Sequence, residues 1–189
     1  MNQSRVYETF QRILDVVREC DVEKICEEVC QLCVATLHNL ALDREHQFFS
    51  VSNHAVELLK NAALISPGCK LRACEVVSTL ACGSINTKKL LEEGGWSMIK
   101  YSGEMSDGTD QHTRCAIAIR NLLTVVSNHD VMLKDGLIPT LVIIARSTPK
   151  VKRQCVVALR QLAFNKKSRP GLGLQPAAMA LILEDGQMK

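Results

Sequence analysis

One short helical segment recurs four times along this chain at a nearly constant spacing. The copies read TLHNLA, VVSTLA, AIRNLL and ALRQLA, and their aligned leucines are Leu40, Leu80, Leu122 and Leu162. These leucines are 40, 42 and 40 residues apart, a period typical of stacked helical repeats. Each repeat in such a stack contacts its neighbours, and the stack presents a long surface to other proteins. The pattern therefore predicts an all-α solenoid of about four repeats that binds a protein partner.

The same segments predict where the core lies. Residues at i, i+3, i+4 and i+7 share one face of a helix, and this face is apolar at 15 of the 16 positions in the four copies. The four sets are Cys33, Thr36, Leu37, Leu40; Ala73, Val76, Val77, Leu80; Cys115, Ala118, Ile119, Leu122; and Cys155, Ala158, Leu159, Leu162. One repeat alone cannot cover such a stripe, so we expect stacking on the neighbouring repeats to bury it.

Small apolar residues rather than aromatic ones supply this core. Of 189 residues, 47% are hydrophobic and only seven are Phe, Trp or Tyr, which suits closely packed helices better than a strand sandwich. No run approaches the roughly 20 apolar residues that span a bilayer. The polar start MNQSRVYETFQR also lacks the apolar centre of a secretory signal. These features predict a cytosolic or nuclear chain without a transmembrane segment.

Most of the cysteines are interpreted as small core residues. Their number is odd and no secretory signal is present, so reduced thiols are expected rather than a disulfide framework. The nine are Cys20, Cys26, Cys30, Cys33, Cys69, Cys74, Cys82, Cys115 and Cys155. Three of them occupy a repeat position that Ala73 fills in the second copy, which predicts a small buried slot.

The segments between the copies predict two further helices in each repeat. After the third copy, Ser127 or Asn128 is expected to cap a short helix and Gly136 to end it. Pro139 then suits the first turn of the next helix, where its missing N–H needs no partner. The preceding repeat has Asn86 and Gly94 at the matching positions.

This three-helix pattern resembles the armadillo repeat, with HEAT repeats as the nearest alternative. The run AIRNLLTVVSNHDVMLKDGLIPTLVIIARST followed by KVKRQCVVALRQLA carries the resemblance most strongly. Armadillo units end in a long third helix with an asparagine before a leucine, and their first helix leads to a glycine, an isoleucine and a proline. On this basis the expected repeats span 22–66, 67–107, 108–148 and, in part, 149–168.

The armadillo resemblance implies a right-handed superhelix with a concave groove lined by the third helices. A row of asparagines in such grooves binds the backbone of an extended peptide, and the matching positions here are Asn39, Thr79, Asn121 and Gln161. An amide side chain offers both a donor and an acceptor to a peptide backbone. Because threonine is shorter, weak or discontinuous peptide binding is expected.

The residues beside this row point to an acidic partner. Importin alpha, which resembles the chain in fold, places a tryptophan one turn before each asparagine. The equivalents here are Ala35, Glu75, Ile117 and Val157, which cannot form an aromatic slot for lysine stems. Basic residues adjoin the row instead, at His38, Arg72, Arg114, Arg120 and Arg160. They suit acidic side chains, as in the basic groove of beta-catenin, and solvated helix faces are the alternative interpretation.

Positive charge is concentrated near the C-terminal end. Residues 146–169 include eight basic and no acidic side chains, whereas residues 1–145 have 14 basic and 18 acidic ones. The segment 146–169 is therefore an alternative binding element, for nucleic acid or an anionic surface. A third hypothesis is an assembly or co-chaperone factor with an armadillo client-binding region.

The sequence contains no constellation that predicts catalysis, a cofactor or a small-molecule substrate. Cys26, Cys30 and Cys33 share one helix face, and so do His112 and Cys115. Structural zinc needs four ligands, usually in two close pairs, and no second pair accompanies either set. We therefore expect a non-enzymatic scaffold or adaptor without a bound metal.

The two ends depart from the repeat pattern. Residues 1–21 look like a helical remnant of a preceding repeat or an N-terminal cap. Residues 169–189 contain two prolines and three glycines, which predict an irregular tail. The array is accordingly expected to be truncated or irregularly capped, as a fragment, a short isoform or a segment of a larger scaffold.

Overall fold

The fold is all α. The computed structural model describes residues 8, 12, 23–42, 55–83, 87–173 and 176–186. In these ranges the chain forms eleven helices and no strand, which confirms the predicted class. They are α2 (Glu23–Leu42), α4 (Ala55–Ala62), α5 (Pro67–Leu80), α6 (Thr87–Glu92), α7 (Gly95–Met105), α8 (Thr109–Leu122), α9 (Ser127–Lys134), α10 (Leu137–Ala145), α11 (Pro149–Phe164), α12 (Arg169–Gly173) and α13 (Pro176–Gly186). The predicted remnant at 1–21 lies almost wholly outside the described residues.

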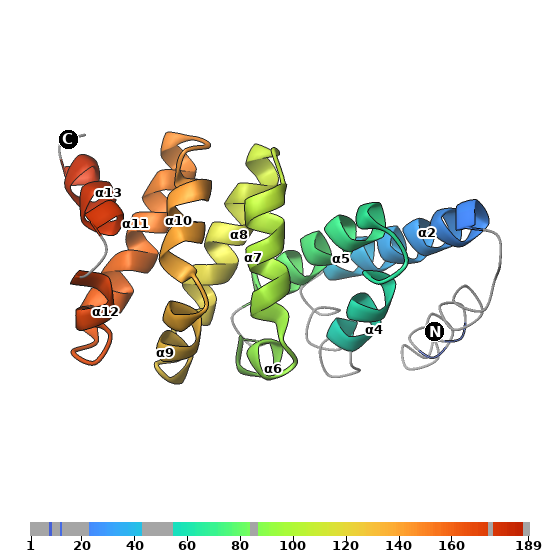
Figure 1. The fold of residues 1–189 in the computed structure, drawn as a ribbon, viewed down its shortest axis with the longest axis horizontal. Coiled ribbons are helices and arrows are strands. Elements are labelled where there is room, and N and C mark those ends of the chain that lie inside the picture. Colours follow the sequence, from blue (N-terminus) through green and yellow to red (C-terminus); the bar gives the residue numbers. More distant parts are fainter. Residues whose placement is uncertain are drawn as a thin grey trace.

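The helices follow one another along the longest axis of the molecule (Figure 1). The four segments that repeat in the sequence end α2, α5, α8 and α11, and each of these helices packs against the next. On the near side in Figure 1, α7 packs against α8, and α10 packs against α11. Two complete three-helix units are thus visible, α6–α7–α8 and α9–α10–α11. None of the described helices combines the length and the apolar character that crossing a bilayer requires.

The predicted apolar stripe forms the core. All four stripe positions of α5, α8 and α11 are buried. The small slot is buried in every copy, at Cys33, Ala73, Cys115 and Cys155. The first copy differs, because Thr36 is exposed and its hydroxyl donates to the carbonyl of Leu32 at 2.8 Å. The stripe therefore holds in the three later copies, where a packed helix lies on each side.

Two of the long helices begin with a hydroxyl residue followed by proline. The Ser66 hydroxyl accepts from the backbone N–H of Cys69 at 3.1 Å and caps α5. The Thr148 hydroxyl accepts from the N–H of Val151 at 3.3 Å and caps α11. The following prolines occupy the first helical turn, where no N–H is needed.

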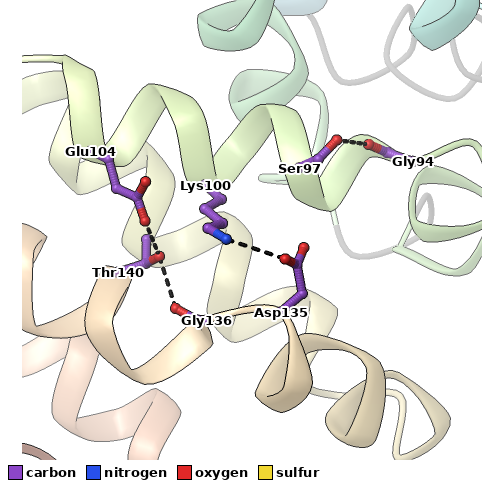
Figure 2. A network of polar contacts seen from close by, with 7 residues as sticks. All are labelled: Gly94, Ser97, Lys100, Glu104, Asp135, Gly136 and Thr140. Carbon is purple, nitrogen blue, oxygen red and sulfur yellow. Dashed lines mark hydrogen bonds and ion pairs between the residues drawn. The ribbon is translucent and has the colours of Figure 1, made fainter.

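Gly94 and Gly136 end the short first helices of their units, as the sequence predicts. Both have a left-handed backbone, with φ of 82° and 81°. A lysine of the preceding unit covers each turn. Lys60 donates to the carbonyl of Glu93, and Lys100 Nζ lies 3.2 Å from Asp135 Oδ1 (Figure 2). The turns therefore join consecutive units as well as helices within one unit.

A second contact in Figure 2 links the same two units. The Thr140 hydroxyl on α10 lies 2.7 Å from Glu104 Oε1 on α7 and 3.0 Å from the Gly136 carbonyl. Thr140 is fully buried. The buried Thr140 hydroxyl therefore has hydrogen-bond partners, and its contact with Glu104 links α7 to α10.

The predicted cap of α9 is wrong. The helix begins at Ser127 after Val126, and no side chain caps its N-terminus. The Asn128 amide instead donates to the Leu122 carbonyl at 2.8 Å, at the end of α8. The last carbonyls of a helix lack partners within it. Asn128 therefore caps the C-terminal end of α8 rather than the N-terminus of α9.

The C-terminal segment also differs from the predicted irregular tail. Residues 169–173 and 176–186 form α12 and α13, and both helices pack against α11. Pro176 is the first residue of α13, and Pro170 is the second residue of α12. Proline is compatible with a helix when it lies in the first turn. These prolines therefore begin helices rather than prevent them.

Candidate partner-binding face

The row of predicted partner-binding residues lies on the four long helices. Asn39 is exposed on α2, Thr79 and Asn121 are buried on α5 and α8, and Gln161 is half-buried on α11. Side chains next to these positions contact one another across consecutive long helices. We call the surface formed by these four residues and their basic neighbours the row face.

Asn121 makes its contacts inside the chain. Its Nδ2 donates to the carbonyls of Ala81 at 3.2 Å and Cys82 at 2.7 Å, just beyond the end of α5. The amide has two hydrogens, and both are used. Asn121 is 8% exposed. Its nitrogen therefore donates to carbonyls that would lack a partner at the end of the preceding long helix. The helical period of the sequence could not indicate this role.

Thr79 is likewise engaged within the chain, between α2 and α8. Its hydroxyl donates to the carbonyl of Glu75 at 3.0 Å. Arg114 Nη1 donates to His38 Nε2 at 2.8 Å and lies 3.4 Å from Thr79 Oγ1. Because a guanidinium can only donate, Nε2 accepts, and the neutral His38 ring carries its hydrogen on Nδ1.

The electrostatics of this cluster reflect burial and two arginines. Burial lowers the pKa of His38 below its ordinary 6.5, and the positive charges of Arg114 and Arg72 lower it further. Burial also raises the pKa of Glu75, while Arg72 and Arg114 act in the opposite direction. The charges of Arg72 and Arg114 therefore act on both ionisable groups.

The remaining predicted arginines lie toward α11. Arg120 Nη1 donates to Gln154 Oε1 at 2.9 Å, so Arg120 joins α8 to α11. Arg160 is exposed on α11. Thus Arg72, Arg114, Arg120 and Arg160 come from three long helices that pack in succession.

Gln161 lies at a cavity. The cavity has a volume of about 750 Å³ and opens between the α8–α9 connection and the end of α11. The Gln161 Oε1 atom is buried and has no hydrogen-bond partner. Val126 and Phe164, both exposed, also line the cavity. The helical period in the sequence gives no signal for this pair, since Phe164 is an isolated aromatic residue in a basic segment.

His129 lines this cavity and is held by hydrogen bonds on both ring nitrogens. Its Nε2 lies 2.8 Å from the Leu123 carbonyl, and its Nδ1 lies 3.0 Å from Ser168 Oγ and 3.3 Å from Asn165 Nδ2. A carbonyl only accepts, so Nε2 carries the hydrogen and Nδ1 accepts. His129 is 2% exposed. Both ring nitrogens are therefore used to hold the α8–α9 connection against the end of α11.

The cysteines are buried, and their chemistry follows from burial. Cys30, Cys33, Cys69, Cys74, Cys115 and Cys155 are buried, so the core interpretation is confirmed for these six, whereas Cys82 is partly exposed. Burial raises the pKa of Cys74 and Cys155 to about 12 and that of Cys82 to about 11. The side chain of Cys26 and all of Cys20 lie outside the described residues. A buried thiol with a raised pKa is a poor nucleophile and metal ligand.

No group of three His, Cys, Asp or Glu side chains in the described part of the chain is arranged to hold a metal ion. The Cys115 sulfur contacts Ser78, Gln111 and the Ile99 carbonyl. Both ring nitrogens of His112 are buried without a hydrogen-bond partner, and the residue is 9% exposed. His112 and Cys115 thus share α8, where the Cys115 sulfur contacts groups within the core.

Comparison with known proteins adds no family to this picture. No protein-family model matches the chain, and no curated protein or solved structure matches it. The resemblance to armadillo repeats therefore depends on the residues and helices described above.

Proposed function

We propose that this chain is a non-enzymatic interaction scaffold of the armadillo type, a right-handed solenoid that binds an extended acidic segment of a partner protein. The support comes from the order of the helices. Two complete units repeat a short helix, a left-handed glycine and two longer helices, and the long third helices pack in succession. Stacked units of this kind provide the continuous surface that an extended segment needs.

The hydrogen bonds of Arg114 and Arg120 are the main support for an acidic partner. Arg114 donates to His38 and Thr79, and Arg120 donates to Gln154, so both guanidinium groups donate to neutral acceptors. Among the described residues, no carboxylate lies within ion-pair distance of either guanidinium. These cations are thus oriented in advance while keeping donors for a charged ligand. A partner carboxylate gains a charge-assisted hydrogen bond without the full cost of ordering a flexible side chain.

Within this proposal, the predicted site residues have different roles. Arg72, Arg114, Arg120 and Arg160 supply charge, whereas Asn39 and Gln161 supply amides to the partner backbone. Thr79 and the amide nitrogen of Asn121 hold the long helices in place. Peptide pairing is therefore discontinuous along the row face, with the middle positions used by the scaffold itself.

Titration with a fluorescent acidic peptide tests the proposed function. The probe alternates glutamate with serine, and a peptide with glutamine in place of glutamate is its neutral control. We expect the acidic probe alone to bind, and the double variant Arg72→Ala/Arg120→Ala to weaken it about tenfold or more. One charge-assisted hydrogen bond contributes roughly 1.5 to 3 kcal/mol, and about 1.4 kcal/mol corresponds to tenfold.

Lys88→Ala/Lys134→Ala is the matched control, because it removes the same charge from two exposed residues on α6 and α9. It should bind the acidic probe within about twofold of the wild type, since distant surface charges are screened by salt. If both double variants weakened binding of the acidic probe equally, net charge alone would explain the effect. That result would refute specific binding at the row face. Tighter binding of an RNA oligonucleotide or of anionic vesicles would favour the basic segment 146–169 as the functional element.

A further inference from the structure

The cavity beside Gln161 has the features of a binding site. Its volume of about 750 Å³ lies within the roughly 300 to 1,000 Å³ typical of ligand pockets. Three parts of the chain line it: the α8–α9 connection, His129 on α9, and the end of α11 with the residues that follow it. Gln161 belongs both to the cavity and to the row face. The cavity therefore continues the proposed binding surface at its C-terminal end.

Apolar atoms line the entrance and remain exposed to solvent. Phe164 is 83% exposed, and Val126 is 60% exposed. Leu123, which is buried, continues the apolar lining inward. An exposed phenylalanine next to a cavity offers a large apolar contact that an aliphatic side chain can cover.

One residue that lines the cavity has a polar atom that still needs a donor. Gln161 Oε1 is buried and accepts no hydrogen bond, and a buried acceptor without a partner is unfavourable. The surrounding polar groups do not supply the hydrogen, since His129 uses both ring nitrogens elsewhere. A peptide backbone N–H is a donor of the required kind, and it accompanies every side chain of a bound peptide except that of proline.

The cavity rim is positively charged. Lys166 and Lys167 line it and are exposed. The segment 146–169 around them contains no acidic residue. Within the described ranges, no carboxylate lies within ion-pair distance of either lysine. The complementary ligand therefore carries negative charge next to its apolar group.

The hydrogen bonds around the cavity keep its shape. Asn165 Oδ1 accepts from the N–H of Lys167 at 3.0 Å, and this bond orders the turn that follows α11. His129 joins that turn to Leu123 through the contacts described above. A site held in this way needs little rearrangement to accept a ligand.

We infer that this cavity is an anchor pocket for one large aliphatic side chain of an acidic peptide segment. The side chain packs against Phe164 and Val126, and rotation of the half-buried Gln161 side chain toward the cavity lets its amide oxygen accept the peptide N–H. Carboxylates flanking the aliphatic residue pair with Lys166 and Lys167. This inference rests on the proposed function, because it specifies which residue of the acidic segment is recognised and where.

Two short fluorescent peptides test the pocket. One has a single leucine between two pairs of glutamates, and the other has alanine in place of the leucine. The wild-type chain should bind the leucine peptide about tenfold more tightly than the alanine peptide, because buried anchors dominate such interfaces. Phe164→Ala should abolish this preference while leaving affinity for the alanine peptide within about twofold.

Leu64→Ala is the matched control. Leu64 is 78% exposed in the α4–α5 connection, so this variant removes an equally exposed apolar side chain far along the sequence from the cavity. It should keep the full preference for leucine. Gln161→Met, which keeps the side-chain length but removes the amide acceptor, should weaken both peptides because both donate the same N–H.

A leucine analogue that carries a photoreactive diazirine locates the anchor directly. Crosslinks should fall within 123–129 and 161–167, the segments that line the cavity. If both acidic peptides bind equally to the wild type and to Phe164→Ala, the anchor pocket is refuted and the acidic-segment proposal stands. If neither peptide binds, both are refuted. Preferential capture of RNA or of anionic vesicles by the same residues would overturn the peptide occupant.

Discussion

Arg114 on α8 donates to His38 on α2 at 2.8 Å, although the two residues are 76 positions apart in sequence. The contact passes beside Thr79 on α5, the helix that packs between them in the series. Three long helices thus share one cluster of polar side chains. The protonation state of a single histidine therefore affects contacts among three long helices.

Acidification should destabilise the chain through His38. Because the folded-state pKa of His38 is below its ordinary 6.5, the unfolded chain binds this proton more strongly. Stability from the neutral ring is therefore present above pH 6.5 and is lost as pH falls from 6.5 through the folded pKa. Denaturant unfolding at several pH values across this window measures the loss. His38→Gln, whose amide oxygen can accept from Arg114, should show a smaller decrease.

Glu75 also makes the free energy of unfolding depend on pH, so the His38 effect is measured as a difference between two variants. Its folded-state pKa is raised above 4.5, so its stabilising contribution is present below 4.5 and is lost as pH rises through the folded value. This trend opposes that of His38. The difference between the wild type and His38→Gln cancels the part due to Glu75. A difference that stays constant across the window would contradict the assigned role of His38.

Removing the Asn121 amide should destabilise the fold. Asn121→Ala leaves the carbonyls of Ala81 and Cys82 without their side-chain donor, and one such loss costs roughly 1 to 3 kcal/mol. Asn121→Asp should be worse than alanine, because a carboxylate only accepts and would face two carbonyl oxygens. Urea unfolding measures both variants.

Asn39→Ala is the control for this series, since Asn39 is the exposed equivalent on α2. An exposed substitution of this kind changes stability by about 0.5 kcal/mol or less. Equal effects at both asparagines would show that the contacts of Asn121 do not stabilise the packing of α8 on α5.

Gly136→Ala should destabilise the turn between α9 and α10. The backbone φ of 81° disfavours any L side chain, by roughly 1 to 2 kcal/mol. A new Cβ would lie 3.1 Å from Lys100 Nζ, the flexible end of a side chain that can move, so the backbone strain dominates. Thermal unfolding measures the effect. Gly173→Ala should not be destabilising, because no atom lies within 4 Å of a Cβ there and no positive φ applies. Equal losses at both glycines would contradict the backbone explanation.

The described cysteines should react slowly in the folded protein. In a Cys20→Ser/Cys26→Ser background, a thiol reagent at mildly alkaline pH reports on the seven that the structure places. Only thiolates react, and burial raises the pKa of Cys82 to about 11 and of Cys74 and Cys155 to about 12. Cys82 should react first because it is partly exposed. Denaturation should make all seven react rapidly. Fast labelling of all seven before denaturation would contradict their burial.

Local patterns in the sequence predicted the helices and most of their core. The spacing of apolar residues predicted the stripes of α5, α8 and α11, which are buried. Gly94 and Gly136 predicted the two left-handed turns, since a positive φ favours glycine. These features depend on helical periodicity and backbone sterics, which act over a few residues. They can therefore be read without knowing which helices are neighbours.

The tertiary structure decided how the polar residues are used. The sequence placed Asn121 and Gln161 at equivalent positions, but Asn121 meets the end of α5, whereas Gln161 meets a cavity with its acceptor unsatisfied. The pairing of Arg114 with His38 likewise depends on how α2, α5 and α8 stack. Helical period specifies the face on which a side chain lies, but the atoms opposite that face belong to distant segments. Only the packing of the helices therefore determines which amides and cations are used inside the chain.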